Sequence, residues 1–287
     1  MKELHRFKRW LLPQTCLNND GWVIYMKIIV CIKQVPDTNE VKIDQKTGTL
    51  IREGVPSIIN PDDKNALEQA LSIKDKYDDV NVIVVTMGPP QAEVALIEAL
   101  AMGADRAILL SDKTFAGADT LATSRTLAAA IKKLGNFDII LCGRQAIDGD
   151  TAQVGPQLAE HLGLAQATYV QRVEIEKDNL LVTRALEDGY EILALKTPCL
   201  LTAVKELNKP RYMRVKKIFE AYNEKTVEYW SVKDIDIDVV NIGLKGSPTN
   251  VWKSFTPSQK GKGIIYENAD RETIEELVSK LREKYVL

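Results

Sequence analysis

The feature that most constrains the fold is an alternation, beginning at residue 26, of short apolar runs with longer amphipathic stretches. The runs are rich in Val, Ile and Leu, and the stretches between them show helical spacing. Strands that are apolar on both faces and joined by helices form parallel sheets with crossover connections. We therefore predict an α/β fold with a doubly wound, mostly parallel sheet, with strands at 27–35, 80–87, 107–110 and 137–142 and helices at 62–76, 91–102, 118–134 and 151–162.

After residue 162 the pattern changes to closely spaced strands. We expect these at 167–176, 180–185, 191–196 and 199–204, with a hairpin turn at Glu187-Asp188-Gly189. An antiparallel extension of the same sheet fits this pattern better than a separate domain. Residues 26–212 thus form the expected main domain, and residues 213–287 an irregular C-terminal arm with a final helix at about 270–285. The arm either folds back on its own domain or packs on a partner subunit.

Residues 1–25 precede the first expected strand and hold basic residues but no continuous apolar segment. We expect Met26 to be the natural start and residues 1–25 to be a disordered or non-native extension. The alternative is a targeting or docking arm.

The composition argues against several classes of protein. The 38 basic and 40 acidic residues are spread along the chain, so no basic stripe is available for nucleic acid. No apolar run approaches the roughly 20 residues that cross a bilayer, so we expect a soluble protein without membrane insertion. The four cysteines, Cys16, Cys31, Cys142 and Cys199, are widely spaced and accompanied by only two histidines, which argues against a metal site or a disulfide framework.

The densest candidate site is the glycine-rich segment 142–156, which follows an expected strand and opens an expected helix. Ligands of open α/β sheets bind at this edge, and the free N–H groups of a helix start favour a phosphate. Asp148 and Asp150 would repel a phosphate unless they cap backbone N–H groups or hold ribose hydroxyls, which leaves Thr151 and Gln153 as phosphate donors. The alternative is a capped turn that binds nothing, since the spacing matches no standard phosphate motif.

Four other loops fall at or near the same edge: residues 31–38, 60–63, 86–90 and 115–124. Asn60 can bond an adenine edge or cap the helix that begins with Pro61. Met87 can line an apolar adenine slot or belong to the core. Asp119 or Thr120 can simply cap its helix.

Taken together, these segments resemble the electron-transfer flavoprotein beta family from residue 26 to the end of the chain. The matching pieces are the V-C-I-K run at 30–33, Asn60-Pro61, Gly88-Pro89, residues 99–105, 143–155 and 207–212, and the signature positions Val182, Arg184, 187–189, Glu191, Leu193 and Pro198. The resemblance implies an adenine nucleotide alpha hydrolase-like fold and a heterodimer with an alpha subunit. In ordinary members the beta subunit holds AMP, and the working FAD lies in the alpha subunit.

The sequence is more similar to the electron-bifurcating branch of this family, on residues 33–38, 86–90, 117–120, 148–151 and 246–249. That branch implies a complete FAD in the beta subunit, which takes hydride from NADH. One electron then passes to the alpha FAD and on to a flavin dehydrogenase of the acyl-CoA type, and the other to ferredoxin or flavodoxin. Small residues at Gly149 and Ala152 leave room for the larger cofactor. Oxidoreductase activity is thus expected only within a cytoplasmic complex.

The resemblance assigns a role to particular residues. Arg144 either stabilises a flavin anion or is a surface charge. The expected cofactor-binding residues are Cys31, Lys33, Asn60, Asp62, Asp63, Thr86, Met87, Gly88, Gly117, Asp119, Thr120, Gly143, Arg144, Gln145, Ala146, Ile147, Asp148, Gly149, Asp150, Thr151, Gln153 and Val154. The expected dehydrogenase-docking residues are Leu207, Pro210, Arg211 and Tyr212, with Leu207 as the anchor. The competing hypotheses are a conventional subunit with structural AMP, a nucleotide-binding hydrolase or transferase on the same sheet, and a scaffold without ligand.

Overall fold

A computed structural model describes residues 15–18, 21–24, 26–37, 56–176, 179–250 and 263–287, with the side chains of residues 15–24 excluded. The described residues up to 250 belong to one compact unit and residues 263–287 to a second. Thr38 and residues 1–14 of the expected extension lie outside the described part. A short antiparallel pair, β1 (Thr15–Asn18) and β2 (Gly21–Ile24), precedes the main sheet. The disordered or non-native character expected for residues 1–25 stays a prediction.

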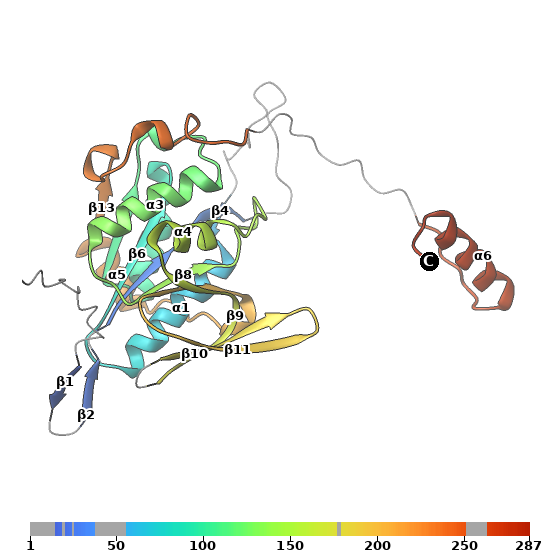
Figure 1. Ribbon diagram of the computed structural model, residues 1–287, viewed down its shortest axis with the longest axis horizontal. Coiled ribbons are helices and arrows are strands. Elements are labelled where there is room, and N and C mark those ends of the chain that lie inside the picture. Colours follow the sequence, from blue (N-terminus) through green and yellow to red (C-terminus); the bar gives the residue numbers. More distant parts are fainter. Residues whose placement is uncertain (1–14, 19–20, 25, 38–55, 177–178, 251–262) are drawn as a thin grey trace, which may run out of the picture. The chain divides into compact units, whose positions relative to one another are not determined.

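The main unit is built on a nine-stranded sheet with the order β11-β10-β9-β12-β8-β3-β6-β7-β13 (Figure 1). The six strands from β12 to β13 are parallel, and β9 is parallel to β12. Strands β10 and β11 extend the sheet in antiparallel fashion. The strands are β3 (Met26–Cys31), β6 (Val80–Met87), β7 (Arg106–Leu110), β8 (Ile139–Gly143), β9 (Ala165–Ile175), β10 (Leu180–Leu186), β11 (Gly189–Leu195), β12 (Cys199–Ala203) and β13 (Val227–Trp230).

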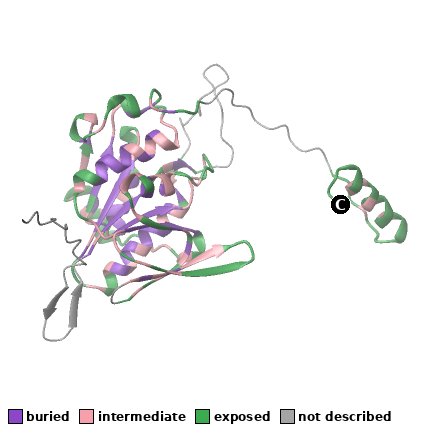
Figure 2. Cartoon of the chain, in the orientation of Figure 1, coloured by how far each residue is buried: buried purple, intermediate pink, exposed green. Residues whose placement is uncertain are grey.

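Helices cover both faces of this sheet. The layer on one face contains α1 (Pro61–Lys76), α2 (Glu93–Met102) and α5 (Val215–Asn223), and the other contains α3 (Thr120–Leu134) and α4 (Val154–Leu162). Strand β3 shows why both faces must be covered, since Ile28 and Val30 pack into the first layer and Ile29 and Cys31 into the second. Figure 2 shows the buried residues in these central strands and in the helix faces that meet them. The predicted doubly wound fold is confirmed.

The bounds of most predicted elements agree with the structure to within a few residues. The segment 27–35 is an exception, because β3 ends at Cys31 and a separate strand β4 (Gln34–Pro36) pairs antiparallel with β5 (Ser57–Ile59). Short 3₁₀ turns lie at Pro90–Ala92, Lys113–Phe115, Lys205–Leu207, Val232–Asp234 and Val239–Asn241. The expected turn at residues 187–188 does join β10 to β11.

The prediction for residues 199–204 is wrong in one respect. These residues were expected to belong to the antiparallel extension, whereas β12 lies inside the parallel part, between β8 and β9. All five β12 residues are buried. Burial on both faces is typical of a central parallel strand, which explains why this segment lacks the polar alternation of its neighbours.

The residues after 212 also differ from the expected irregular arm. They form α5, which packs against α2 and adds Ile218 and Ala221 to the core of this layer, and β13, the edge strand beside β7. The compact unit therefore continues past residue 212. The second unit contains α6 (Arg271–Glu283), which Asp270 caps by accepting the Thr273 N–H at 2.9 Å.

None of the described helices combines the length and apolar character needed to span a membrane. Cys31, Cys142 and Cys199 are buried free thiols, as expected for the described cysteines.

Candidate functional site

The candidate site lies where the direction of the sheet winding reverses. From β3 the chain adds β6 and β7 on one side, and then returns to place β8 on the other side of β3. The register aligns Cys31 with Cys142 at the carboxyl ends of this pair. Loops that leave two such strands diverge, and ligands of open α/β sheets bind in the resulting crevice.

Asp63, in the first turn of α1, ties these two strand ends together. Its carboxylate accepts the backbone N–H of Lys33 at 2.8 Å and that of Gly143 at 2.9 Å, so one buried side chain joins α1 to the loops after β3 and β8. Burial raises the pKa of Asp63 to about 7, although hydrogen bonds from Lys33, Asn60 and Gly143 favour the charged form. A group with this pKa is partly charged near neutral pH.

Asn60 holds the loop after β8 in place. Its amide donates to the Gln145 carbonyl at 2.8 Å and accepts the Ile147 N–H at 3.0 Å, and the residue is fully buried. It makes no side-chain cap to α1. Asn60 does occupy the N-cap position of α1, directly before Pro61, but its side-chain amide positions the loop instead of capping the helix.

The two acids of the loop are each paired within the protein. Lys33 Nζ lies 2.6 Å from an Asp148 oxygen, and Gln145 Nε2 donates to Asp150 at 2.8 Å. Neither acid accepts a backbone N–H from the described residues, so the expected capping is not seen there. Lys33 neutralises the less exposed of the two, so an anion near this loop meets less repulsion than the sequence suggests.

The loop ends in backbone that offers donors. Asp150 and Ala152 have φ of 47° and 52°, a left-handed conformation that non-glycine residues seldom adopt and that concentrates at functional sites. The N–H groups of Thr151, Ala152 and Gln153 donate to no other residue of the described chain. They lie directly before α4, whose first-turn N–H groups and dipole also favour an anion. The Gln153 side chain accepts the Thr120 hydroxyl at 2.9 Å, which joins the starts of α3 and α4.

Three glycines of this segment have different roles. A Cβ on Gly143 would lie 2.2 Å from an Asp63 oxygen, and one on Gly155 would lie 2.6 Å from the Thr202 methyl group. A Cβ on Gly149 would meet nothing within 4 Å. Close approach at Gly143 and Gly155 is thus explained by the protein's own packing, and only Gly149 opens onto free space.

Arg144 lies beside the site with an incompletely bonded guanidinium. Its Nε is 3.4 Å from an Asp62 oxygen but is buried and makes no hydrogen bond to the described residues. The guanidinium carbon lies 5.8 Å from the Tyr169 ring centroid. Burial raises the pKa of Asp62, and the charge of Arg144 opposes that rise. Arg144 is therefore held by neighbours rather than free on the surface.

The residues expected at the other strand ends lie at the same edge. Thr86 is buried and donates to the Ile32 carbonyl at 2.7 Å, and Met87 is partly buried against the α3 and α4 layer. Cys31 and Cys142 are register partners on β3 and β8, and the neighbouring Cys31 thiol together with burial holds the pKa of Cys142 well above its usual value. The backbone at Gly88 lies close to the 3₁₀ turn that follows it, since a Cβ on Gly88 would lie 3.1 Å from the Cβ of Ala92.

The start of α3 is tied to the segment 246–249. Asp119 caps α3 through the Ala122 N–H at 3.0 Å and accepts the Thr249 hydroxyl at 2.8 Å, while its own N–H donates to Ser247 at 2.8 Å. Gly117 has φ of +71°, and a Cβ there would lie 3.2 Å from the Cβ of Leu244. Backbone conformation and packing therefore explain the glycine, and no ligand is needed to explain it. The start of α3 and the segment 246–249, which are far apart in the sequence, are therefore joined by hydrogen bonds.

The expected docking segment is only partly exposed. Leu207 is half-buried and packs against the core, and Arg211 turns toward α1, where it pairs with Glu68 at 2.8 Å. Tyr212 is 91% exposed. The sequence reasoning missed the apolar residues that follow on α5, where Val215, Phe219 and Tyr222 are 84%, 64% and 64% exposed. Their i, i+4, i+7 spacing was the signal that could have revealed them.

The fold and this edge define a doubly wound α/β protein whose polar loop groups gather at the sheet's switch point. Residues 47–235 match the family model described as the electron transfer flavoprotein domain. The chain is 62% identical over 262 residues to the electron transfer flavoprotein subunit beta of Clostridium acetobutylicum, and the match covers 91% of this chain and 100% of the relative.

Two further relatives carry names of reductase complexes. The caffeyl-CoA reductase-Etf complex subunit CarD of Acetobacterium woodii is 58% identical, over 91% of this chain and 100% of its own. The acryloyl-CoA reductase electron transfer subunit gamma of Anaerotignum propionicum is 50% identical with the same coverage. The chain belongs to the electron-transfer flavoprotein family, as a beta subunit, and its role is electron transfer within a multisubunit complex.

Proposed function

We propose that the edge between β3 and β8 binds an adenine nucleotide, with a phosphate on the N–H groups of residues 151–153 at the start of α4. The observation that carries this proposal is that these three N–H groups make no other hydrogen bond within the described chain, beside open space at Gly149. The pairing of Asp148 with Lys33 removes the main electrostatic objection. The residues present thus fit an anionic ligand group.

The nucleotide is FAD, which supplies hydride acceptance from NADH and one-electron transfer onward, while the protein supplies position and charge. Lys33, Asn60 and Asp63 organise the loops that would hold it, and Arg144 brings a positive charge to the same edge. Bound FAD would supply the redox chemistry of bifurcation, with one electron from NADH passing towards the alpha-subunit FAD and the other towards ferredoxin or flavodoxin. This bifurcating role rests on the sequence resemblance.

The partners are an alpha subunit and a flavin dehydrogenase of the acyl-CoA type, in the cytoplasm. Two relatives at 58% and 50% identity are named as subunits of caffeyl-CoA and acryloyl-CoA reductase complexes, which supports this choice of dehydrogenase. The α6 helix buries none of its residues, and we assign residues 263–287 to packing on the alpha subunit.

The dehydrogenase docks on the exposed apolar side chains Tyr212, Val215, Phe219 and Tyr222, which we call the α5 stripe. Leu207 stays a candidate anchor beside this stripe, although part of its side chain packs on the core of its own subunit. Exposed apolar groups on a helix are binding candidates because their burial by a partner is favourable.

The experiment is co-expression with an alpha subunit, followed by release of the bound nucleotides and their quantification per heterodimer. Two FAD per heterodimer support the proposal. One FAD with one AMP supports the second candidate, a conventional subunit in which AMP fills the same edge. That candidate needs the same N–H groups but no room beyond Gly149.

A nucleotide-binding hydrolase or transferase is less well supported. Among the described residues no group of three His, Cys, Asp or Glu side chains is arranged to hold a metal ion that would activate a phosphate. Turnover of ATP by the chain without its partner would favour this class.

A further inference from the structure

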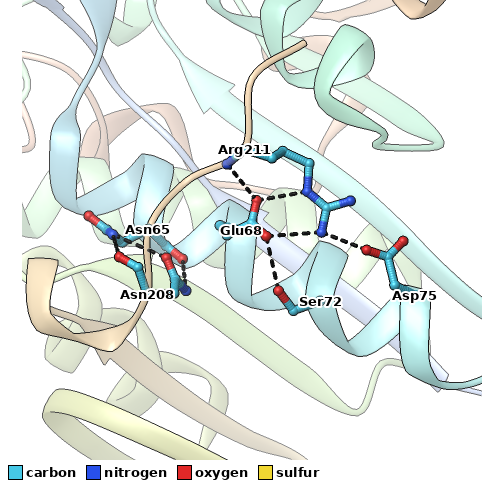
Figure 3. Close-up of polar contacts among 6 residues, drawn as sticks. All are labelled: Asn65, Glu68, Ser72, Asp75, Asn208 and Arg211. Carbon is cyan, nitrogen blue, oxygen red and sulfur yellow. Dashed lines mark hydrogen bonds and ion pairs between the residues drawn. The ribbon is translucent and has the colours of Figure 1, made fainter. Parts of the chain in front are cut away.

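The segment that leads into the α5 stripe is fastened to α1 by a buried ion pair (Figure 3). The Glu68 carboxylate accepts three hydrogen bonds from Arg211, from its backbone N–H at 3.0 Å, its Nε at 2.8 Å and its Nη2 at 2.9 Å. Ser72 lies on the next turn of α1 and donates a fourth at 3.0 Å. Both oxygens of Glu68 are therefore fully used by specific donors.

The two charges differ in their surroundings. The Glu68 side chain is 9% exposed, whereas that of Arg211 is 29% exposed and also reaches the surface acid Asp75 at 2.7 Å. Hydrogen bonding to Glu68 raises the pKa of Arg211, so its charge persists at every physiological pH. A buried carboxylate without its counter-ion is costly, so the chain at Arg211 is strongly held in this position.

A second contact acts one turn earlier on the same helix. The Asn65 amide donates to the Asn208 backbone carbonyl at 2.7 Å, and the Asn208 amide donates to the Asn65 carbonyl at 3.0 Å. Both residues are at least partly buried. Residues 208 and 211 are thus held on successive turns of one helix, with Pro210 stiffening the chain between them.

We propose that Glu68 and Asn65 are positioning residues which, through Arg211 and Asn208, hold the segment 208–214 on α1 so that the α5 stripe is preformed for its partner. This inference rests on the docking role proposed above. A preformed surface binds more tightly because less chain entropy is lost on association.

The first test measures the segment itself, in the purified heterodimer, by amide hydrogen exchange. Glu68→Gln keeps the side-chain shape but removes the charge, and we expect exchange at residues 209–214 to rise about tenfold or more. Exchange in β3 and β8 and the nucleotide content should stay unchanged. Glu98→Gln is the matched control, because Glu98 pairs with Lys64 on the same helix layer but does not touch the segment. Asn208→Ala is a milder variant that should act in the same direction.

The second test separates positioning from general stability. With an acyl-CoA dehydrogenase as electron acceptor, Glu68→Gln should raise the KM for that acceptor about fivefold and leave kcat unchanged. Arg211→Lys, which keeps the charge, should lie between wild type and Arg211→Gln.

Unchanged exchange at 209–214 in both Glu68→Gln and Asn208→Ala would overturn the proposal, as would faster exchange with an unaltered KM. If the wild-type heterodimer reduces no such dehydrogenase, the docking role fails, and the exchange result still decides whether Glu68 and Asn65 order the segment.

Discussion

At the scale of single residues, the site depends on polar side chains that the protein uses to hold its own loops. Asp63 and Asn60 were expected to face a ligand, and both instead bond backbone groups of the loops after β3 and β8. Such residues act on a ligand indirectly, by fixing the backbone that would contact it. Substitution should therefore affect stability and ligand retention together.

Asp63 gives a prediction for pH. Its folded pKa of about 7 lies above the ordinary value of 3.8, so the folded state takes up a proton as the pH falls below 7. The free energy of unfolding should therefore decrease as the pH rises from about 4 to 7, by roughly 2–3 kcal/mol between pH 5 and pH 8 from this group. Urea unfolding of wild type and Asp63→Asn at both pH values measures this, and an equal pH dependence in the two proteins would contradict the assignment.

Two glycines give a matched pair. Gly143→Ala places a methyl group against the Asp63 carboxylate and backbone, whereas Gly149→Ala meets open space. We expect the first to lower the free energy of unfolding by about 2 kcal/mol or more and the second to change it by less than about 0.5 kcal/mol. Gly149→Leu should keep the stability but lower nucleotide retention. Equal losses of stability at both positions would mean that the loop packs differently.

At the scale of elements, the loop of residues 144–153 is a built structure clamped from α1. Asn60→Ala removes both clamping bonds, so exchange of the Ile147 amide should accelerate and the unfolding free energy should fall by about 2 kcal/mol. Asn223→Ala is a control, since among the described residues its side chain bonds only the Phe219 carbonyl of its own helix. An unchanged exchange rate of the Ile147 amide in Asn60→Ala would show that the loop keeps its conformation without the Asn60 hydrogen bonds.

The α5 stripe gives the prediction for docking. Val215→Ser with Phe219→Ser should raise the KM for the dehydrogenase and leave stability near wild type, because both side chains are exposed. Leu207→Ala should instead lower stability by about 1–2 kcal/mol, since it removes packing from the core. A normal KM in the double variant would place docking elsewhere.

At the scale of the whole molecule, the sequence predicted the alternating elements and the edge where the candidate loops meet, because apolar periodicity is local. It could not give the order of strands, which depends on pairing between distant segments. Only the mostly apolar character of residues 199–203, in which Thr202 is the one polar residue, hinted that β12 is central. Helix α5 was not predicted, although Val215, Phe219 and Tyr222 have the i, i+4, i+7 spacing of a helix.

The same distinction holds for the site. Residue types and spacing brought the loops after β3, β6 and β8 to one edge, as observed. They could not show that Asp63 accepts the Gly143 N–H, or that Asn60 bonds the loop after β8. These hydrogen bonds join segments about 80 residues apart, as for Asp63 and Gly143. Partnerships of this kind are visible only in the folded chain.

The central claim is that the loops at the β3–β8 switch point hold an adenine nucleotide. A crystal structure of the heterodimer purified with its natural cofactors tests this most directly. We predict a nucleotide phosphate within hydrogen-bonding distance of the N–H groups of residues 151–153. A heterodimer in which those groups face solvent, with every nucleotide bound elsewhere, would contradict the account.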